Sequence, residues 1–188
     1  NGEIDAARDG KLPDLVEAWY AGTWRVALLP GSRPAEIRHH TEVLLDIATA
    51  VRRNWSGSRC TFATLSRNAG RIVEQTARRR SAGPVDVVVG DQAVHEVLRE
   101  SHLAVAGSGT VTLQAAYYGV PLAVFYHTGL LTWLLHHTLG RVRSLVATRH
   151  YSLVNSLAGR YVVPEFMPWR GSPRPIVATV VDMLEDLG

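Results

Sequence analysis

The chain has 188 residues, of which 46% are hydrophobic and 20% charged, proportions typical of a single globular domain. Its formal net charge is only +3, and it lacks the basic-aromatic motifs of nucleic-acid readers, so no nucleic-acid partner is expected. Cys60 is the single cysteine, which excludes an intramolecular disulfide and a cysteine-based zinc cluster and suits a reducing cytoplasm.

Short apolar runs alternate with longer amphipathic segments along the chain. A leading helix is expected before residue 22, and the apolar runs then predict five strands, over 25–30, 60–66, 85–89, 102–107 and 121–126. The segments between and after them predict helices over 34–54, 69–80, 91–101, 110–119 and 173–188. Pro34 suits a first helical turn, and Asp91 is the expected N-cap of its helix.

Strands that are apolar throughout and separated by helices indicate a parallel sheet covered on both faces. We therefore predict an α/β fold with a doubly wound, mainly parallel, Rossmann-like sheet. The whole chain, 1–188, is expected to form one domain. Its parts are a leading helix or linker over 1–22, a core over 23–166 and a closing helical segment over 167–188.

Two strand-to-helix turns, "LLPGSRPAE" and "AGSGTVTLQ", have the composition of anion-binding loops. Their small and polar residues are Gly31, Ser32, Arg33, Ser108, Gly109 and Thr110. Small residues expose backbone N–H groups at a helix amino terminus, where a phosphate is favoured, and an arginine adds positive charge. Glycine and serine also form ordinary tight turns, so each turn alone is ambiguous. Together, on one sheet edge, they favour a phosphate-bearing ligand.

Neither turn matches a standard nucleotide-binding fingerprint. No Gly-Lys-Ser/Thr follows either turn, and "GSGTVT" lacks the last glycine of the dinucleotide motif. ATP hydrolysis and NAD chemistry are therefore not expected, and a sugar nucleotide remains the natural ligand.

Four stretches, taken in order, resemble the lipid-A-disaccharide synthase family, whose members are glycosyltransferases of the GT-B fold. They are "LLPGSRPAEI", "AVAGSGTVTLQAAYYGVPLAVFY", "LTWLL" and "YSLVNSLAGRYVVPEF". The resemblance covers most of the chain, but only the carboxyl-terminal, donor-binding half of the family. It implies an amino-terminal acceptor domain, supplied in cis or in trans.

The resemblance implies transfer of 2,3-diacylglucosamine from UDP to lipid X, which yields the lipid A disaccharide precursor. It assigns the UDP diphosphate to Ser108, Gly109 and Thr110, beside Gly31 and Ser32, and the charge on the leaving group to Arg33. Asn155, in the "SLVN" stretch, is the second expected catalytic residue and would line the interdomain cleft. Glu165 matches a family glutamate with no assigned role. No cofactor and no metal are expected, and no general base can be named.

The chain departs from the family at several positions. Gln114 replaces a glutamate expected to accept hydrogen bonds from the ribose hydroxyls, so nucleotide binding by Gln114 would be weaker, by about 1–2 kcal/mol. His127 and Val154 replace a common arginine and a common proline. Two alternatives therefore stay open: a diverged, non-catalytic UDP-sugar-binding module, and another UDP-sugar enzyme of GT-B architecture.

The segment "TGLLTWLLHHTLGRVR", residues 128–143, carries leucines and a tryptophan with basic residues towards its end. It predicts either a helix in the membrane interface, on the inner face of the bacterial inner membrane, or a helix packed against the protein. The pairs His39-His40 and His136-His137 are neighbours that point in different directions on a helix, so neither is expected to share a metal. No signal peptide and no membrane-spanning run is visible in this sequence.

Overall fold

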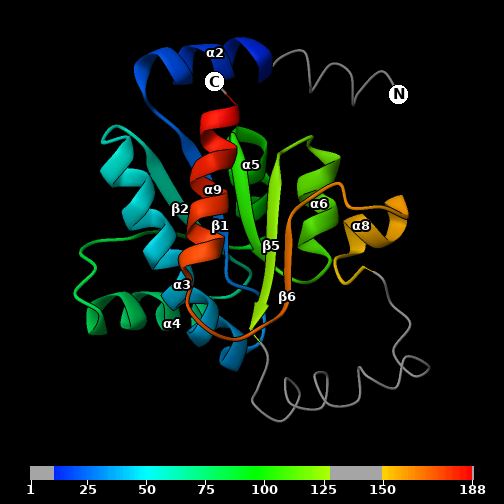
Figure 1. Ribbon diagram of the computed structural model, residues 1–188. Helices are drawn as coiled ribbons and strands as arrows, with labels where there is room; N and C mark the ends of the chain where they lie inside the picture. Colours follow the sequence, from blue (N-terminus) through cyan, green and yellow to red (C-terminus); the bar gives the residue numbers. More distant parts are fainter. Residues whose placement is uncertain (1–10, 128–149, 188) are drawn as a thin grey trace.

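The computed structural model of the chain describes residues 11–127 and 150–187. Within them, six parallel strands form one sheet in the order β3-β2-β1-β4-β5-β6 (Figure 1). The strands are β1 Arg25–Leu29, β2 Arg59–Thr64, β3 Asp86–Val89, β4 Leu103–Gly107, β5 Leu122–His127 and β6 Glu165–Trp169. This is the doubly wound strand order, with its switch point between β1 and β4. The predicted α/β, Rossmann-like fold is confirmed.

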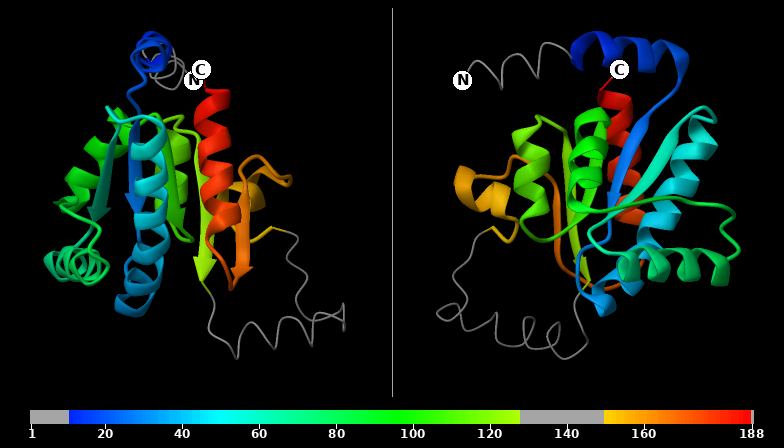
Figure 2. Two further views of the ribbon diagram at one scale, coloured as in Figure 1. Left: turned by 60° about the vertical axis from the view of Figure 1, so that its left-hand side comes forward. Right: turned by 180° about the vertical axis from the view of Figure 1, so that it is seen from behind.

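Helices cover both faces of the sheet, as Figure 2 shows in two side views. Their bounds are α2 Lys11–Ala21, α3 Pro34–Asn54, α4 Arg67–Arg79, α5 Asp91–Glu100, α6 Val111–Tyr117, α8 Leu153–Ala158 and α9 Arg174–Asp186. One face is covered by α3, α4 and α9, and the other by α5 and α6, with α8 beside α6. The leading helix α2 lies across the end of the sheet at which the strands begin (Figure 1).

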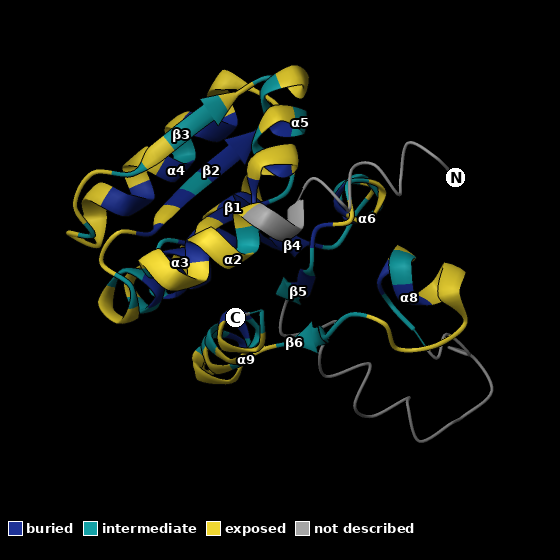
Figure 3. Cartoon of the chain, turned by 90° about the horizontal axis from the view of Figure 1, so that it is seen from above, coloured by how far each residue is buried: buried dark blue, intermediate teal, exposed yellow. Residues whose placement is uncertain are grey.

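The sheet separates two hydrophobic clusters, and successive residues of β1 enter opposite ones. Val26 and Leu28 pack with α3, α4 and α9, whereas Ala27 and Leu29 pack with α5 and α6. Every residue of β4 is buried, and the dark strands at the centre of Figure 3 show the same for most of the sheet. Burial on both faces explains why the central strands are apolar throughout rather than alternating.

The sixth strand was not among the predicted ones. Its sequence, "EFMPW", is short, lies only half-buried at the sheet edge and contains Pro168, which an edge position tolerates. β6 also crosses the boundary expected at residue 166. The expected N-cap role of Asp91 is wrong: Gly90 is the N-cap of α5, and Asp91 lies in the first turn, where its charge complements the helix dipole. Pro34 does begin α3.

None of the helices in the described residues is both long and apolar enough to cross a membrane.

Candidate functional site

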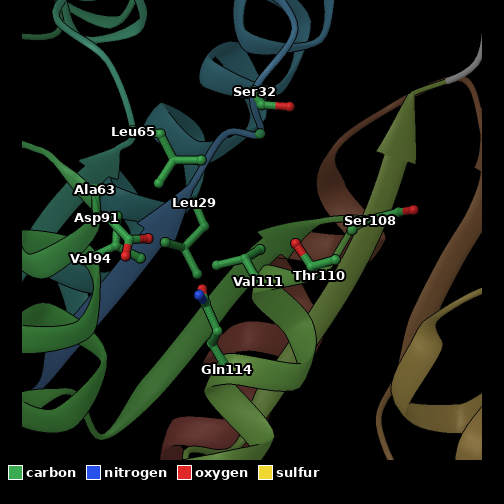
Figure 4. Close-up of a pocket in the computed structure, with 12 residues that line it drawn as sticks. Leu29, Ser32, Ala63, Leu65, Asp91, Val94, Ser108, Thr110, Val111 and Gln114 are labelled. Atoms are coloured by element: carbon green, nitrogen blue, oxygen red, sulfur yellow. The ribbon is translucent and has the colours of Figure 1, made fainter.

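A pocket of about 180 Å³ opens where the carboxyl ends of the central strands meet the following helices (Figure 4). Its walls come from the ends of β1 and β2, from the turns that follow β1, β2 and β4, and from the first turns of α5 and α6. The lining residues are Leu29, Gly31, Ser32, Ala63, Leu65, Asp91, Val94, Ser108, Gly109, Thr110, Val111 and Gln114. Six of the seven residues predicted to bind a nucleotide therefore meet in one pocket, and only Arg33 lies outside its lining.

The turn after β1 is held in place by a buried histidine, His40. Its Nδ1 lies 2.9 Å from the carbonyl oxygen of Pro30, and the backbone N–H of His127 donates to its Nε2 at 3.2 Å. Nε2 accepts, so Nδ1 carries the hydrogen and donates to Pro30. Burial lowers the pKa of His40 to about 4, against weaker opposing effects. The neutral ring thus ties the end of β1 to the end of β5.

The turn after β4 depends on two glycines. A Cβ at Gly107 would lie 2.8 Å from His40 Nδ1, so only glycine lets this turn pack against the histidine. Gly109 has a φ of 150°, which side chains rarely adopt. Thr110 precedes α6 without a side-chain cap, and Thr112 Oγ1 instead donates to the Gly109 carbonyl at 2.7 Å. Thr110 lines the pocket, and its hydroxyl makes no capping hydrogen bond to α6.

Arg33 lies at the start of α3, next to the pocket-lining Ser32, but its side chain turns to Glu36. The guanidinium forms a 2.9 Å ion pair with Glu36 Oε1; the Arg33 side chain is 77% exposed, whereas that of Glu36 is only 14% exposed. The hydrogen bond and charge of Glu36 raise the pKa of Arg33 above its ordinary value. Tyr126 donates to the same carboxylate oxygen at 2.9 Å. The ion pair is therefore open to solvent on its arginine side, while the carboxylate is largely buried and also held by Tyr126.

Gln114 points into the pocket from α6 (Figure 4). Its Nε2 lies 3.4 Å from Nε2 of His95 on α5, and Nδ1 of His95 lies 3.0 Å from the Tyr118 hydroxyl. The contact between Gln114 and His95 could not be predicted from the sequence, because the two residues lie on different helices. The apolar wall of the pocket was not predicted either; it is formed by Leu29, Ala63, Leu65, Val94 and Val111.

Asn155 does not lie at the pocket. It is fully buried, and its amide bonds to the segment that leads into β6. Nδ2 donates to the Val163 carbonyl and to Glu165 Oε2, at 2.9 and 3.0 Å, while Oδ1 accepts from the backbone N–H groups of Val162 and Val163. The NH₂ group and the oxygen of the amide thus both form hydrogen bonds within the protein. This geometry favours a positioning role for Asn155.

Glu165 completes this network from the first residue of β6. Its carboxylate accepts from the backbone N–H groups of Tyr151 and Ser152, at 3.2 and 2.9 Å, as well as from Asn155. Burial alone would raise its pKa, but the hydrogen bonds from Ser152, Asn155 and Tyr151 outweigh it and hold the pKa below its ordinary value. Glu165 thus anchors the start of α8 to the edge strand.

The neighbouring residues His39 and His40 point in different directions from α3, as expected for consecutive residues of a helix. His40 is buried, whereas His39 is exposed and stacks on His127 with ring centres 4.6 Å apart. Within 11–127 and 150–187, no three His, Cys, Asp or Glu side chains are grouped to hold a metal ion. The helix expected over 128–143, whether in a membrane interface or packed against the protein, and the pair His136-His137 lie outside the described residues.

Comparisons with known proteins were made on the whole sequence. Residues 22–187 match the model of the lipid-A-disaccharide synthetase family. The chain is 32% identical over 161 residues to a lipid-A-disaccharide synthase of Pseudomonas paraeruginosa, covering 86% of this chain and 40% of that protein. The enzyme of the same name from Solibacter usitatus is 35% identical over 76% of this chain and 34% of its own length. The enzyme of the same name from Bradyrhizobium diazoefficiens is 29% identical over 99% of this chain and 43% of its own length. The chain thus spans about two fifths of the length of these relatives.

Proposed function

Because the chain belongs to the lipid-A-disaccharide synthase family, we propose that it is the donor-binding part of a glycosyltransferase of lipid A biosynthesis. The donor would be UDP-2,3-diacylglucosamine and the acceptor lipid X. The acceptor would be held by an amino-terminal domain in cis or in trans, and transfer would need no metal. The protein would work at the inner face of the bacterial inner membrane, against which its acylated substrates could be held.

The observation that carries the proposal is the convergence of two distant turns on one pocket. Gly31 and Ser32 follow β1, and Ser108, Gly109 and Thr110 follow β4, at the switch point where doubly wound sheets bind ligands. The pocket is smaller than the ~300–1,000 Å³ of complete ligand sites. It suits one part of a sugar nucleotide whose remainder would contact another domain.

Arg33 would act at the open side of this pocket. Its own side of the ion pair is exposed and Tyr126 also donates to the Glu36 carboxylate, so the guanidinium would be free to rotate to the diphosphate of a bound donor. There it would stabilise the negative charge that builds up on the departing UDP, an interaction that is strongest in the transition state. Asn155 would contribute indirectly, by fixing α8 and the edge strand.

Calorimetric titration of UDP into the chain tests the proposal. We expect UDP to bind, and the double variant Ser108→Ala/Thr110→Ala to bind it more weakly. Ser156→Ala is the matched control, because Ser156 is an exposed serine on α8 outside the pocket lining. An absence of heat at millimolar UDP, or equal loss in the control, contradicts the proposal. Tighter binding of another nucleoside diphosphate would favour a different nucleotide-sugar enzyme.

A further inference from the structure

A groove separate from the pocket at the strand ends lies where α4 packs against α3 (Figure 1). Its volume is about 390 Å³, within the ~300–1,000 Å³ of small-molecule sites. The lining residues are Arg38 of α3 and Ile72, Gln75, Thr76, Arg78 and Arg79 of α4. None of these residues lines the pocket proposed to hold the nucleotide. This hollow is called the arginine groove below.

Positive charge is concentrated at the arginine groove. Residues 67–80 contain five arginines and one glutamate, whereas the whole chain has a formal net charge of only +3. Three guanidinium groups line the groove, and no carboxylate of the described residues does. Glu42 and Glu74 lie one helical turn from Arg38 and Arg78, but neither forms an ion pair with them. The groove therefore has positive charge without a counter-ion of its own.

Arg79 is held at the groove by a buried side chain. Its Nη2 donates to Thr76 Oγ1 at 3.1 Å, and the Thr76 hydroxyl donates to the Ile72 carbonyl at 2.8 Å. Thr76 is only 1% exposed, so the guanidinium is anchored from beneath. A guanidinium has five N–H donors, and the contact with Thr76 uses one of them. The other donors remain for a ligand.

The next arginine along the chain has a different environment. Arg80 forms a 2.8 Å ion pair with Asp46 and donates to the Glu42 carbonyl at 3.0 Å, and it thereby ties the end of α4 to α3. Arg38 and Arg78 have no such contact with any residue in 11–127 or 150–187. Neighbouring guanidinium groups repel one another, so they contribute nothing to stability until an anion lies between them.

The number of arginines selects the kind of anion. A carboxylate has one charge and two oxygens, which one guanidinium can satisfy through two parallel hydrogen bonds. A phosphate monoester carries about −1.5 to −2 charges near pH 7 and has three acceptor oxygens. It can therefore accept from Arg38 and from the arginines of α4 at the same time. The half-buried Ile72 at the groove suits the alkyl carbon of such an ester.

We propose that the arginine groove binds a phosphate monoester, supplied either by a free phosphorylated molecule or by a lipid headgroup. Arg38 provides positive charge from α3 and Arg78 from α4, and Thr76 fixes the third guanidinium, that of Arg79. This site goes beyond the proposed function, because its residues belong to neither glycine turn.

The test is an NMR titration of the whole chain with glycerol 1-phosphate. We expect saturable binding, and the double variant Arg38→Gln/Arg78→Gln should bind about tenfold more weakly or less, because two charge-assisted contacts are lost. Arg53→Gln/Arg99→Gln is the matched control, since it removes two charges from exposed arginines of α3 and α5 outside the groove. An absence of binding, or equal losses in the two double variants, overturns the site.

Two further measurements separate this site from the nucleotide pocket and identify the source of the phosphate. If Ser108→Ala/Thr110→Ala loses glycerol 1-phosphate and the groove variant does not, the phosphate lies in the nucleotide pocket, which overturns the groove site and supports the proposed function. Sedimentation with phosphatidylcholine vesicles, with and without phosphatidic acid, tests the headgroup. Binding that requires phosphatidic acid and both groove arginines indicates a lipid, whereas binding of glycerol 1-phosphate alone indicates a free ligand.

Discussion

His40 occupies the space that a side chain at Gly107 would need, since a Cβ at Gly107 would lie 2.8 Å from His40 Nδ1. The same nitrogen bonds to the Pro30 carbonyl, and the other ring nitrogen accepts from His127. One imidazole therefore holds together the carboxyl ends of β1, β4 and β5. Two of these strand ends continue into the turns that line the pocket.

Gly107→Ala should destabilise the chain by about 1–3 kcal/mol, the usual cost of overpacking a filled interior. The new methyl group must displace the His40 ring and with it the hydrogen bond to Pro30. Urea denaturation measures the change in the free energy of unfolding. On a His40→Ala background the same substitution should cost much less, because the space is then free. Equal costs on the two backgrounds would show that the contact with His40 does not decide the effect.

The stability of the chain should fall as the pH drops from about 6.5 to 4. His40 has a pKa of about 4 when folded and 6.5 as its ordinary value, so in this range the unfolded chain binds the proton more readily. The contribution of neutral His40 to stability is complete above pH 6.5 and is lost progressively as the pH falls to 4. The largest loss in the free energy of unfolding from this residue is about 3 kcal/mol. Denaturation at several pH values measures this slope. His40→Ala should flatten it, and an unchanged slope would assign the effect to other groups, such as His127.

Asn155→Ala should destabilise the chain by about 2–4 kcal/mol, because it leaves the backbone groups of Val162 and Val163 without their side-chain partner. UDP affinity should stay within about twofold, since Asn155 does not line the pocket. Thermal denaturation and calorimetry measure the two quantities. A large loss of affinity at unchanged stability would instead indicate direct contact with the ligand.

Asn155→Asp keeps the size and shape of the side chain but replaces its NH₂ donor with a second carboxylate oxygen. It places a second carboxylate beside Glu165, whose pKa is held below its ordinary value by its hydrogen bonds despite burial. Two adjacent carboxylates repel, so this variant should be less stable at pH 7 than at pH 5, where one of them can take up a proton. An identical pH response of the Asp variant and the wild-type chain would contradict the observed network.

Arg33→Ala should change stability by less than about 1 kcal/mol, because the Arg33 side chain is largely exposed and Glu36 keeps its hydrogen bond from Tyr126. The variant should bind UDP about tenfold more weakly if the guanidinium reaches the diphosphate. Arg53→Ala is the control, since Arg53 is an exposed arginine on α3 outside the pocket lining. Equal affinity losses in both variants would point to a general charge effect rather than to contact by Arg33.

The central part of the fold could be predicted because its pattern is local. β1 and β4 are apolar throughout, and the helices that follow them repeat apolar residues at helical spacing, so each element was visible in its own segment. β6 was missed because an edge strand is only half-buried and carries no such pattern. Pro168 weakened the signal further.

Part of the site could be predicted for a similar reason. Glycine, serine and threonine at strand ends mark turns, and parallel strands bring their carboxyl ends to one edge. The sequence could not show which way a polar side chain turns. Asn155 bonds to its own neighbouring loop, Arg33 to Glu36, and Gln114 to a histidine on another helix.

The pairing of β1 with β4 has a consequence for how the chain would acquire its ligand. Leu29, at the pocket, lies opposite Ala106 in the register of the two strands, although they are far apart in the sequence. Both turns are in place only after this long-range pairing has formed, so a partly folded chain with separated halves has no complete pocket. A bound nucleotide would then stabilise only the finished sheet, by about 2.7 kcal/mol at a hundredfold excess over Kd. The melting temperature of the chain would thus report directly on occupancy.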